Sequence, residues 1–137
     1  MKLELKHLAP YLPYQLKMVD ETMIHDELWY CNKYDVVLYT SEYEVGYGHY
    51  DYEALEHKPI LRPLSDLTKE IEHNEEKFVP TDKLAIHLFD DTTASCIISG
   101  NINGIPYWVM EKLFEWHFDV FRLIDEGLAI NINKLNI

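Results

Sequence analysis

The chain has 137 residues, of which 47% are hydrophobic and 13% aromatic, and it carries 24 Asp and Glu against 12 Lys and Arg, for a formal net charge of −12. This length and hydrophobic content are sufficient for one buried core, which excludes an intrinsically disordered protein. The excess of acid opposes direct binding to nucleic acid or to an anionic membrane, because contacts with phosphate require Lys and Arg.

The N-terminal part of the chain is predicted to form short strands. After a turn region at Pro10 and Pro13, residues 14–19 and 27–31 are predicted as short strands. Residues 34–40 are the most strand-like run, because they are rich in β-branched and aromatic side chains.

Residues 41–52 alternate acids with tyrosines and are interrupted by Gly46 and Gly48. This tract is predicted to be an exposed hairpin or an irregular loop, and its alternation favours at least one strand with a solvated face.

The middle of the chain contains three weaker patterns. Residues 63–72 place apolar side chains at helical spacing, with Pro63 suited to the first turn. Residues 84–89 are ambiguous between helix and strand, and residues 96–99 resemble a brief strand.

The strongest pattern covers residues 106–126, where an apolar stripe repeats at helical spacing: Met110, Leu113, Phe114, His117, Phe121 and Ile124. Pro106 suits the first helical turn and Gly127 a left-handed C-cap. Alternating residues 128–133 then predict a strand. The expected fold class is therefore α+β, with a small, mainly antiparallel sheet packed against one long amphipathic C-terminal helix and a second, shorter helix.

The domain organisation and the compartment follow from what the sequence lacks. No linker or repeat divides the chain, so we expect a single globular domain over residues 1–137. The first ten residues lack the apolar stretch of a signal peptide, and no apolar run is long enough to span a bilayer. We expect a cytoplasmic protein in which Cys31 and Cys96 are reduced.

The negative charge is concentrated in one tract, Met18–His57, which holds ten acids with Lys33 as the only base. Tyrosines beside acids supply contact area and hydrogen-bonding groups suited to Lys and Arg. The tract is therefore predicted either to bind a basic protein surface or to form a plain solvated hairpin. Trp108 is predicted as a further contact residue, because amphipathic aromatics are favoured anchors in protein interfaces. The candidate partner-binding residues are Glu42, Tyr43, Glu44, Tyr47, Tyr50, Asp51, Tyr52, Glu53 and Trp108.

A metal site has weaker support. Imidazole and carboxylate groups suit a divalent transition metal when at least three converge, and His49, Asp51 and His57 are the candidates, with His25 and Asp26 as additional groups. Their spacing matches no known motif, so a chance surface cluster is the favoured interpretation. His117 is interpreted as a core histidine bonded to a backbone carbonyl.

The sequence contains no recognised catalytic motif. Phosphate-binding, dinucleotide-binding, zinc-protease and nucleophile-elbow patterns are all missing. We therefore favour a non-catalytic protein and expect neither catalytic residues nor a cofactor.

Three runs carry a resemblance to a known family: HLAPYLPYQLK at His7–Lys17, KPILRPLSDLTKEI at Lys58–Ile71 and LFEWHFDVFRLIDEGLAININ at Leu113–Asn133. They resemble an uncharacterised family of small phage- and prophage-encoded proteins of Bacteroidota. The resemblance implies an accessory protein made in a bacterial cytoplasm that acts by binding host or phage machinery. Small acidic phage proteins include nuclease inhibitors, such as anti-CRISPR proteins and nucleic-acid mimics.

Together these observations predict a non-catalytic binding protein whose acidic, Tyr-rich segment binds a basic protein surface. The candidate partner is a nucleic-acid-binding enzyme such as a host defence nuclease. Two alternatives remain open. One is a phage assembly or structural role, or a homo-oligomer formed through the aromatic helix, and the other is a small metal-binding protein or enzyme using His49, Asp51 and His57.

Overall fold

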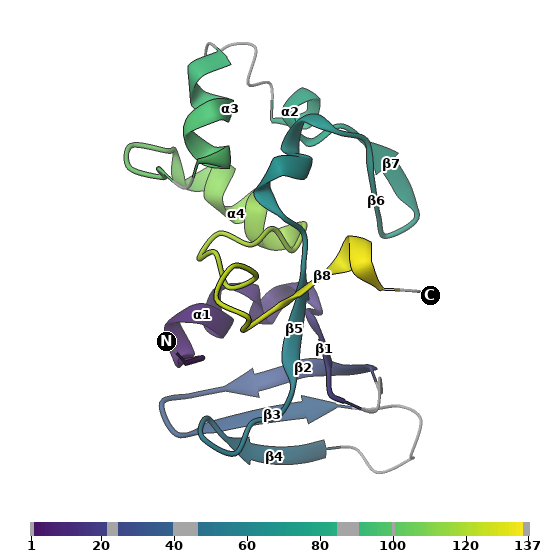
Figure 1. Ribbon diagram of the computed structural model, residues 1–137, viewed down its shortest axis with the longest axis vertical. Coiled ribbons are helices and arrows are strands. Elements are labelled where there is room, and N and C mark those ends of the chain that lie inside the picture. The colour runs from purple at the N-terminus through teal and green to yellow at the C-terminus, as the bar shows by residue number, and fades with distance from the viewer. Residues whose placement is uncertain (1, 22–24, 40–46, 85–90, 100, 136–137) are drawn as a thin grey trace.

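A computed structural model describes residues 2–21, 25–39, 47–84, 91–99 and 101–135. Within these residues six strands form one mixed sheet in the order β4-β3-β2-β1-β5-β8, antiparallel except for the β5–β8 pair (Figure 1). The strands are β1 (Lys17–Val19), β2 (His25–Cys31), β3 (Asp35–Tyr39), β4 (Tyr47–Asp51), β5 (Lys58–Leu61) and β8 (Ile130–Asn131). The strands predicted at 27–31 and 34–40 are β2 and β3, and the strand predicted at 14–19 is shorter, as β1.

One face of the sheet is covered by the N-terminal segment, which contains α1 (Leu5–Leu8) and the 3-10 helix η1 (Ala9–Tyr14). Side chains from both layers form the first hydrophobic cluster, in which Leu8, Tyr11 and Leu16 are fully buried and pack with Leu28 and Leu38 of the sheet. We call this half, with α1, η1, β1–β5 and β8, the sheet lobe.

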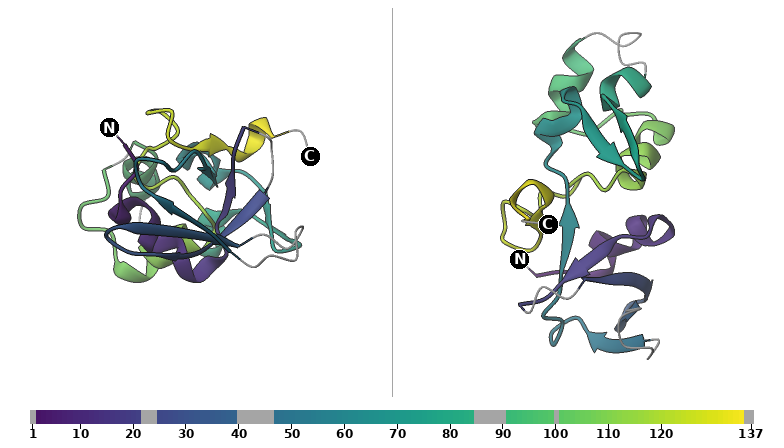
Figure 2. Two further views of the ribbon diagram at one scale, coloured as in Figure 1. Left: turned by 90° about the horizontal axis from the view of Figure 1, so that it is seen from below. Right: turned by 90° about the vertical axis from the view of Figure 1, so that its right-hand side faces the viewer.

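The described residues between Leu64 and Val120 form a second, helical lobe around its own hydrophobic cluster, and β5 leads into it from the sheet (Figure 2). Its elements are the 3-10 helix η2 (Leu64–Thr68), the hairpin of β6 (Ile71–His73) and β7 (Glu76–Phe78), α2 (Pro80–Lys83), α3 (Asp91–Ile98) and α4 (Tyr107–Glu115). A last 3-10 turn, η4 (Ile132–Lys134), follows β8. No helix in the described ranges is long and apolar enough to cross a bilayer.

The prediction of one long C-terminal helix is wrong. Helix α4 has only 9 residues and ends at Glu115. The His117 and Phe118 amides bond back to the carbonyls of Phe114 and Leu113 at 3.0 and 2.9 Å, and His117 takes the left-handed conformation with φ 62°. This is the hydrogen-bond pattern of a Schellman C-cap, where glycine is usual. The apolar pattern of the sequence therefore continues after residue 115, but the residues that carry it there are not part of the helix.

Tertiary hydrogen bonds explain why the helix stops there. The Arg62 amide donates to the His117 carbonyl at 2.7 Å, and the Asp119 amide donates to the Arg62 carbonyl at 2.8 Å. These bonds link the chain after α4 to the end of β5 and leave no continuous helical ladder. Gly127, predicted as the C-cap, does have a positive φ of 74°, but it closes a turn after residue 123.

Two smaller predictions are also wrong. Residues 63–72 form a five-residue 3-10 helix followed by β6, because the chain bends back to pair Ile71 with Phe78. Of residues 96–99, the first three form the end of α3 and Ser99 follows it, and Ile97 is fully buried in the second cluster. A short apolar run is compatible with either a helix or a strand. Here the helix is the structure that buries Ile97. Of the ambiguous segment 84–89, only Leu84 lies within the described residues.

Buried polar contacts join the two lobes. The hydroxyl of Tyr11 donates to the carbonyl of Phe118 and accepts from the Val120 amide at 3.3 Å. Arg62 is 7% exposed, and its guanidinium donates to the carbonyls of Trp116, at 3.1 Å, and Glu72.

His117 is held at this junction as a neutral imidazole. Its Nε2 lies 2.6 Å from the Tyr14 carbonyl, and its ring packs edge-on against His73 with the centroids 5.0 Å apart. Burial, together with the nearby His73 and Arg62, lowers the pKa of His117 from 6.5 to about 4, against the opposing effect of the hydrogen bond to Tyr14. The expected core histidine bonded to a backbone carbonyl is confirmed.

This arrangement predicts a loss of stability in mild acid. Because the folded pKa of about 4 lies below the unfolded value of 6.5, the contribution of neutral His117 is complete above pH 6.5 and is lost as the pH falls toward 4. Between pH 7 and pH 5 we expect a loss of roughly 2 kcal/mol of unfolding free energy from this residue. Urea unfolding at both pH values, with His117→Gln beside the wild type, measures it. The glutamine variant should lose that part of the pH dependence, whereas His49→Gln, on the sheet surface, should retain it. An equal change of unfolding free energy with pH in all three proteins would show that His117 is not its source.

Candidate interaction surface

The face of the sheet opposite α1 and η1 carries large exposed aromatic side chains. Trp29 is 53% exposed and Tyr30 is 48% exposed, and the Trp29 ring lies against Tyr39 of β3 with the centroids 5.6 Å apart. By cross-strand register, Val37 and His49 belong to the same side. We call this the outer face and define it by Lys17, Glu27, Trp29, Tyr30, Asp35, Val37, Tyr39, His49 and Asp51.

A β-bulge places two successive aromatics on the outer face. Leu28 pairs with Leu38 and Tyr30 pairs with Val37, so Trp29 is the extra residue of β2. In a regular strand neighbouring side chains point to opposite faces, and a bulge re-aims one of them. The irregularity therefore concentrates Trp29 and Tyr30 on one side.

Acidic side chains lie beside these aromatics. Glu27 is the cross-strand partner of both Lys17 and Tyr39, and Asp35 lies opposite Asp51. Two acids directly opposite each other destabilise a sheet. The Asp51 carboxylate accepts a hydrogen bond from the Ala54 amide at 2.6 Å, but the Asp35–Asp51 pair remains a local excess of negative charge.

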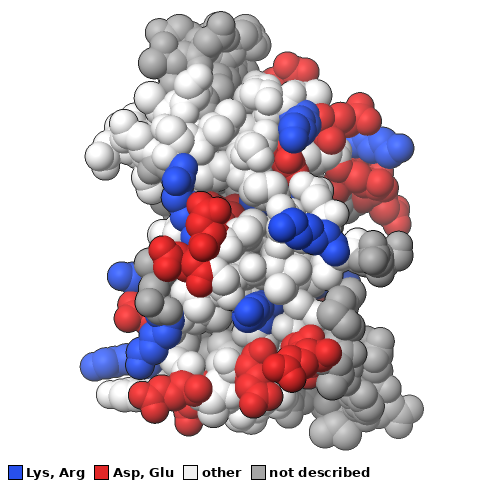
Figure 3. Space-filling view, in the orientation of Figure 1, with Lys and Arg blue, Asp and Glu red and all other residues white. Residues whose placement is uncertain are grey.

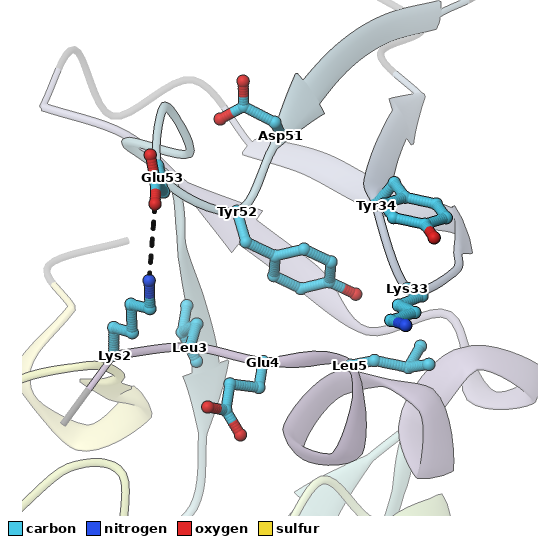
Figure 4. A pocket seen from close by; sticks show the side chains of 9 residues that line it. All are labelled: Lys2, Leu3, Glu4, Leu5, Lys33, Tyr34, Asp51, Tyr52 and Glu53. Carbon is cyan, nitrogen blue, oxygen red and sulfur yellow. Dashed lines mark ion pairs between the residues drawn. The ribbon is translucent and has the colours of Figure 1, made fainter.

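A cleft of about 440 Å³ opens at the end of the sheet next to this pair. The N-terminal segment forms one wall, and the β2–β3 turn and the end of β4 form the others (Figure 4). Tyr52 extends across the middle of the cleft, and Glu53 points toward Lys2. The lining residues are Lys2, Leu3, Glu4, Leu5, Lys33, Tyr34, Asp51, Tyr52 and Glu53.

A buried ionisable cluster lies on the inner side of the sheet. His57, just before β5, is 5% exposed, and its Nε2 lies 2.9 Å from Asp26 Oδ2 and 3.7 Å from Asp20 Oδ2. Tyr50 of β4 packs over the His57 ring at 5.0 Å between centroids and also covers Gly48, where an added Cβ would lie 3.0 Å from the tyrosine ring. Burial raises the pKa of Tyr50, and the nearby Asp26 raises it further.

The structure divides the predicted partner-binding residues. Glu42, Tyr43 and Glu44 lie outside the described residues, and of Tyr47 only the backbone, in β4, is described. Asp51 and Glu53 are exposed, whereas the rings of Tyr50 and Tyr52 pack inward. Trp108 belongs to α4 in the helical lobe, apart from the sheet surface (Figure 1).

The acids of the Met18–His57 tract do not share one face. Asp26 is buried against His57, while Asp20, Glu21 and Glu56 line a separate cavity of about 570 Å³. Acidic side chains also appear over both lobes in Figure 3. Charge alone therefore does not distinguish the sheet lobe.

The metal-site candidates do not converge. His49 and Asp51 lie on the outer face, whereas His57 is buried on the inner side. Among the residues that the structure describes, no three His, Cys, Asp or Glu side chains lie close enough to hold a metal ion. The side chain of His25, one of the additional candidates, lies outside the described residues. Cys31 and Cys96 are both free thiols, and Cys31 is buried.

Sequence reasoning missed Trp29, Tyr30 and Tyr39 as surface residues. Residues 27–31 were recognised as a strand, but strict alternation would place Trp29 and Tyr30 on opposite faces. The only available signal was two adjacent aromatics in a strand that also contains acids.

Comparisons with known proteins give no relative to assist the assignment: no family model, no curated protein and no solved structure matches the chain. The resemblance to phage-encoded proteins therefore stays a prediction.

Proposed function

We propose that this protein is a non-catalytic binding protein that holds a basic segment of another protein against its outer face. The observation that carries the proposal is the bulge of β2, which presents Trp29 and Tyr30 side by side, 53% and 48% exposed, on the face that bears Glu27, Asp35 and Asp51.

The chemistry of this face favours a partner rich in Lys and Arg. Exposed Trp and Tyr are the residues that most often dominate the energy of protein interfaces. Their ring faces attract cations, most strongly for Trp with Arg, by about 0.5–1 kcal/mol at exposed sites. The flanking carboxylates supply charge partners and steer a basic segment toward the rings.

The partner class that fits this surface is a protein with a basic channel, such as a nucleic-acid-binding enzyme. A net charge of −12 repels nucleic acid itself but is complementary to surfaces that bind it. Occupation of such a channel would exclude its normal ligand, which is the action of a nuclease inhibitor. This step rests on charge and on the resemblance to phage accessory proteins.

The test is binding of a synthetic Arg-rich peptide, measured by calorimetry at physiological salt. Trp29→Ala and Tyr30→Ala should each weaken binding by about thirtyfold, the effect of losing a hot-spot residue worth about 2 kcal/mol. Tyr107→Ala is the matched control, because Tyr107 is 78% exposed but belongs to α4 in the helical lobe.

Circular dichroism of each variant checks the fold. If the outer-face variants bind as tightly as the wild type, or if Tyr107→Ala is equally harmful, the proposal fails. The second outcome would indicate non-specific attraction by the net charge.

An assembly role is the second candidate, and it rests on the exposure of Tyr107 and of Trp108, which is 46% exposed. Both lie in the first turn of α4. A stable multimer in light scattering that Tyr107→Ala dissociates would favour assembly over the outer-face proposal.

A further inference from the structure

A turn in the loop before α4 places an asparagine directly before a glycine. Asn103 and Gly104 are the central residues of this turn, which the Ile105 amide closes by donating to the Ile102 carbonyl at 3.3 Å. Gly104 has a positive φ of 79°, as the second central residue of a type II turn requires. The described part of the loop projects from the helical lobe, and both central residues are exposed (Figure 1).

Within the described ranges, the groups that could react with each other are unrestrained. The Gly104 amide donates no hydrogen bond there, and the side chain of Asn103 makes none. A Cβ built on Gly104 would meet no other atom within 4 Å. The Gly104 nitrogen and the Asn103 side chain are therefore open to solvent and free to rotate.

The other asparagines of the chain lack this combination, because none of them is followed by glycine. The side-chain oxygens of Asn32, Asn101 and Asn131 each accept a hydrogen bond from a backbone amide. The side-chain amide of Asn133 donates to Asp66 at 2.8 Å. These contacts hold side chains that Asn103 leaves free.

We propose that Asn103 is a site of spontaneous covalent modification, at which asparagine is converted to aspartate and isoaspartate. The deprotonated Gly104 nitrogen attacks Asn103 Cγ. The N–Cγ bond forms, the Cγ–Nδ2 bond breaks and ammonia leaves, which closes a succinimide ring. Water then adds to either ring carbonyl and opens the ring. Glycine favours the attack because it has no Cβ and rotates freely.

The products change the surface at the start of α4. Both add a negative charge shortly before Tyr107 and Trp108, the exposed residues of the first helical turn. Isoaspartate also lengthens the backbone between Ile102 and Ile105, which pack against the second hydrophobic cluster. The modification therefore alters the surface that an assembly role would use, although the reaction itself depends on neither proposed function.

The test is mass spectrometry of the wild-type protein during incubation in warm, mildly alkaline buffer. Trypsin releases residues 84–112 as one peptide, in which fragment ions separate Asn103 from Asn101, the internal control. Asn103 should gain nearly one mass unit, at a rate within about threefold of that in a synthetic peptide of residues 101–106, because local opening of an exposed loop costs little free energy. Asn101 should stay unchanged over the same period.

Three outcomes would overturn the proposal. An Asn103 that stays intact while the synthetic peptide reacts would show that the fold protects the turn. Equal modification of Asn101 would show that the glycine is not the cause. A product that contains aspartate without isoaspartate, as resolved by chromatography, would show hydrolysis without a succinimide ring.

Discussion

Replacing Tyr11 with alanine is expected to lower the free energy of unfolding by about 3–5 kcal/mol, the range for losing a buried aromatic side chain. Tyr11 is fully buried, and its ring packs edge-on against Phe114 with the centroids 5.0 Å apart. Its hydroxyl bonds the carbonyl of Phe118 and the amide of Val120. The substitution therefore leaves a cavity in the core where the lobes meet, and it removes the hydroxyl from two backbone groups that keep their bond to each other, from the Val120 amide to the Phe118 carbonyl at 2.9 Å.

Urea unfolding followed by circular dichroism measures this loss, and two variants of η1 sharpen it. Tyr11→Phe keeps the ring but removes the hydroxyl, and should cost about 0.5–1.5 kcal/mol, the net contribution of a typical hydrogen bond, because the Val120 amide still bonds to the Phe118 carbonyl. Tyr14→Ala, on the half-exposed side of the same 3-10 helix, should cost less than 1 kcal/mol. A Tyr11→Ala protein no less stable than Tyr14→Ala would show that the junction does not depend on this ring.

The second large effect is expected at the buried pair of His57 and Asp26. Replacing His57 with leucine leaves the Asp26 carboxylate, whose side chain is 9% exposed, without its partner at 2.9 Å. Leaving a buried polar group without its hydrogen-bond partner costs about 1–3 kcal/mol, the desolvation penalty of that group. The unfolding midpoint in urea should fall accordingly.

The matching double variant distinguishes this explanation from a simple loss of packing. Changing Asp26 to leucine together with His57→Leu removes both hydrogen-bonding groups, and replacing both partners of a buried hydrogen bond by apolar groups can be nearly neutral or stabilising. Most of the lost stability should therefore return, whereas His49→Leu on the exposed outer face should have little effect. Additive losses in the double variant would mean that Asp26 is not the group that His57 compensates.

Local patterns predicted much of the sheet. Residues 34–40 were expected as a strand and form β3 at Asp35–Tyr39, since β-branched and aromatic side chains suit a pleated, half-buried surface. Of the alternation predicted for residues 41–52, the part within the described residues is seen in β4, where His49 and Asp51 face out while Tyr50 packs inward. From the acidity and the tyrosine content of this region, Asp51 and Glu53 were predicted as contact residues. Both are exposed and line the cleft.

The candidate surface could be predicted only in part. The acidic tract gave the expectation of a basic partner, but Asp26 is buried against His57, and that contact depends on the pairing of β1 with β2 and β5. The key aromatics, Trp29 and Tyr30, share a face only because β2 is bulged against β3. A bulge is a property of two paired strands, so the sequence of one strand does not reveal it.

The sequence by itself determined that the chain has a hydrophobic core and an excess of acid that opposes phosphate ligands, because both depend on composition. It also determined strands where β-branched and aromatic residues cluster, because these depend on local conformational preference. Only the tertiary structure decided where the last helix ends. The stripe of residues 106–126 satisfies helical periodicity throughout, yet the backbone of residues 117–119 bonds to Arg62, more than fifty positions earlier in the chain. Periodicity shows which side chains are apolar, whereas the hydrogen-bond partners of the backbone depend on the whole fold.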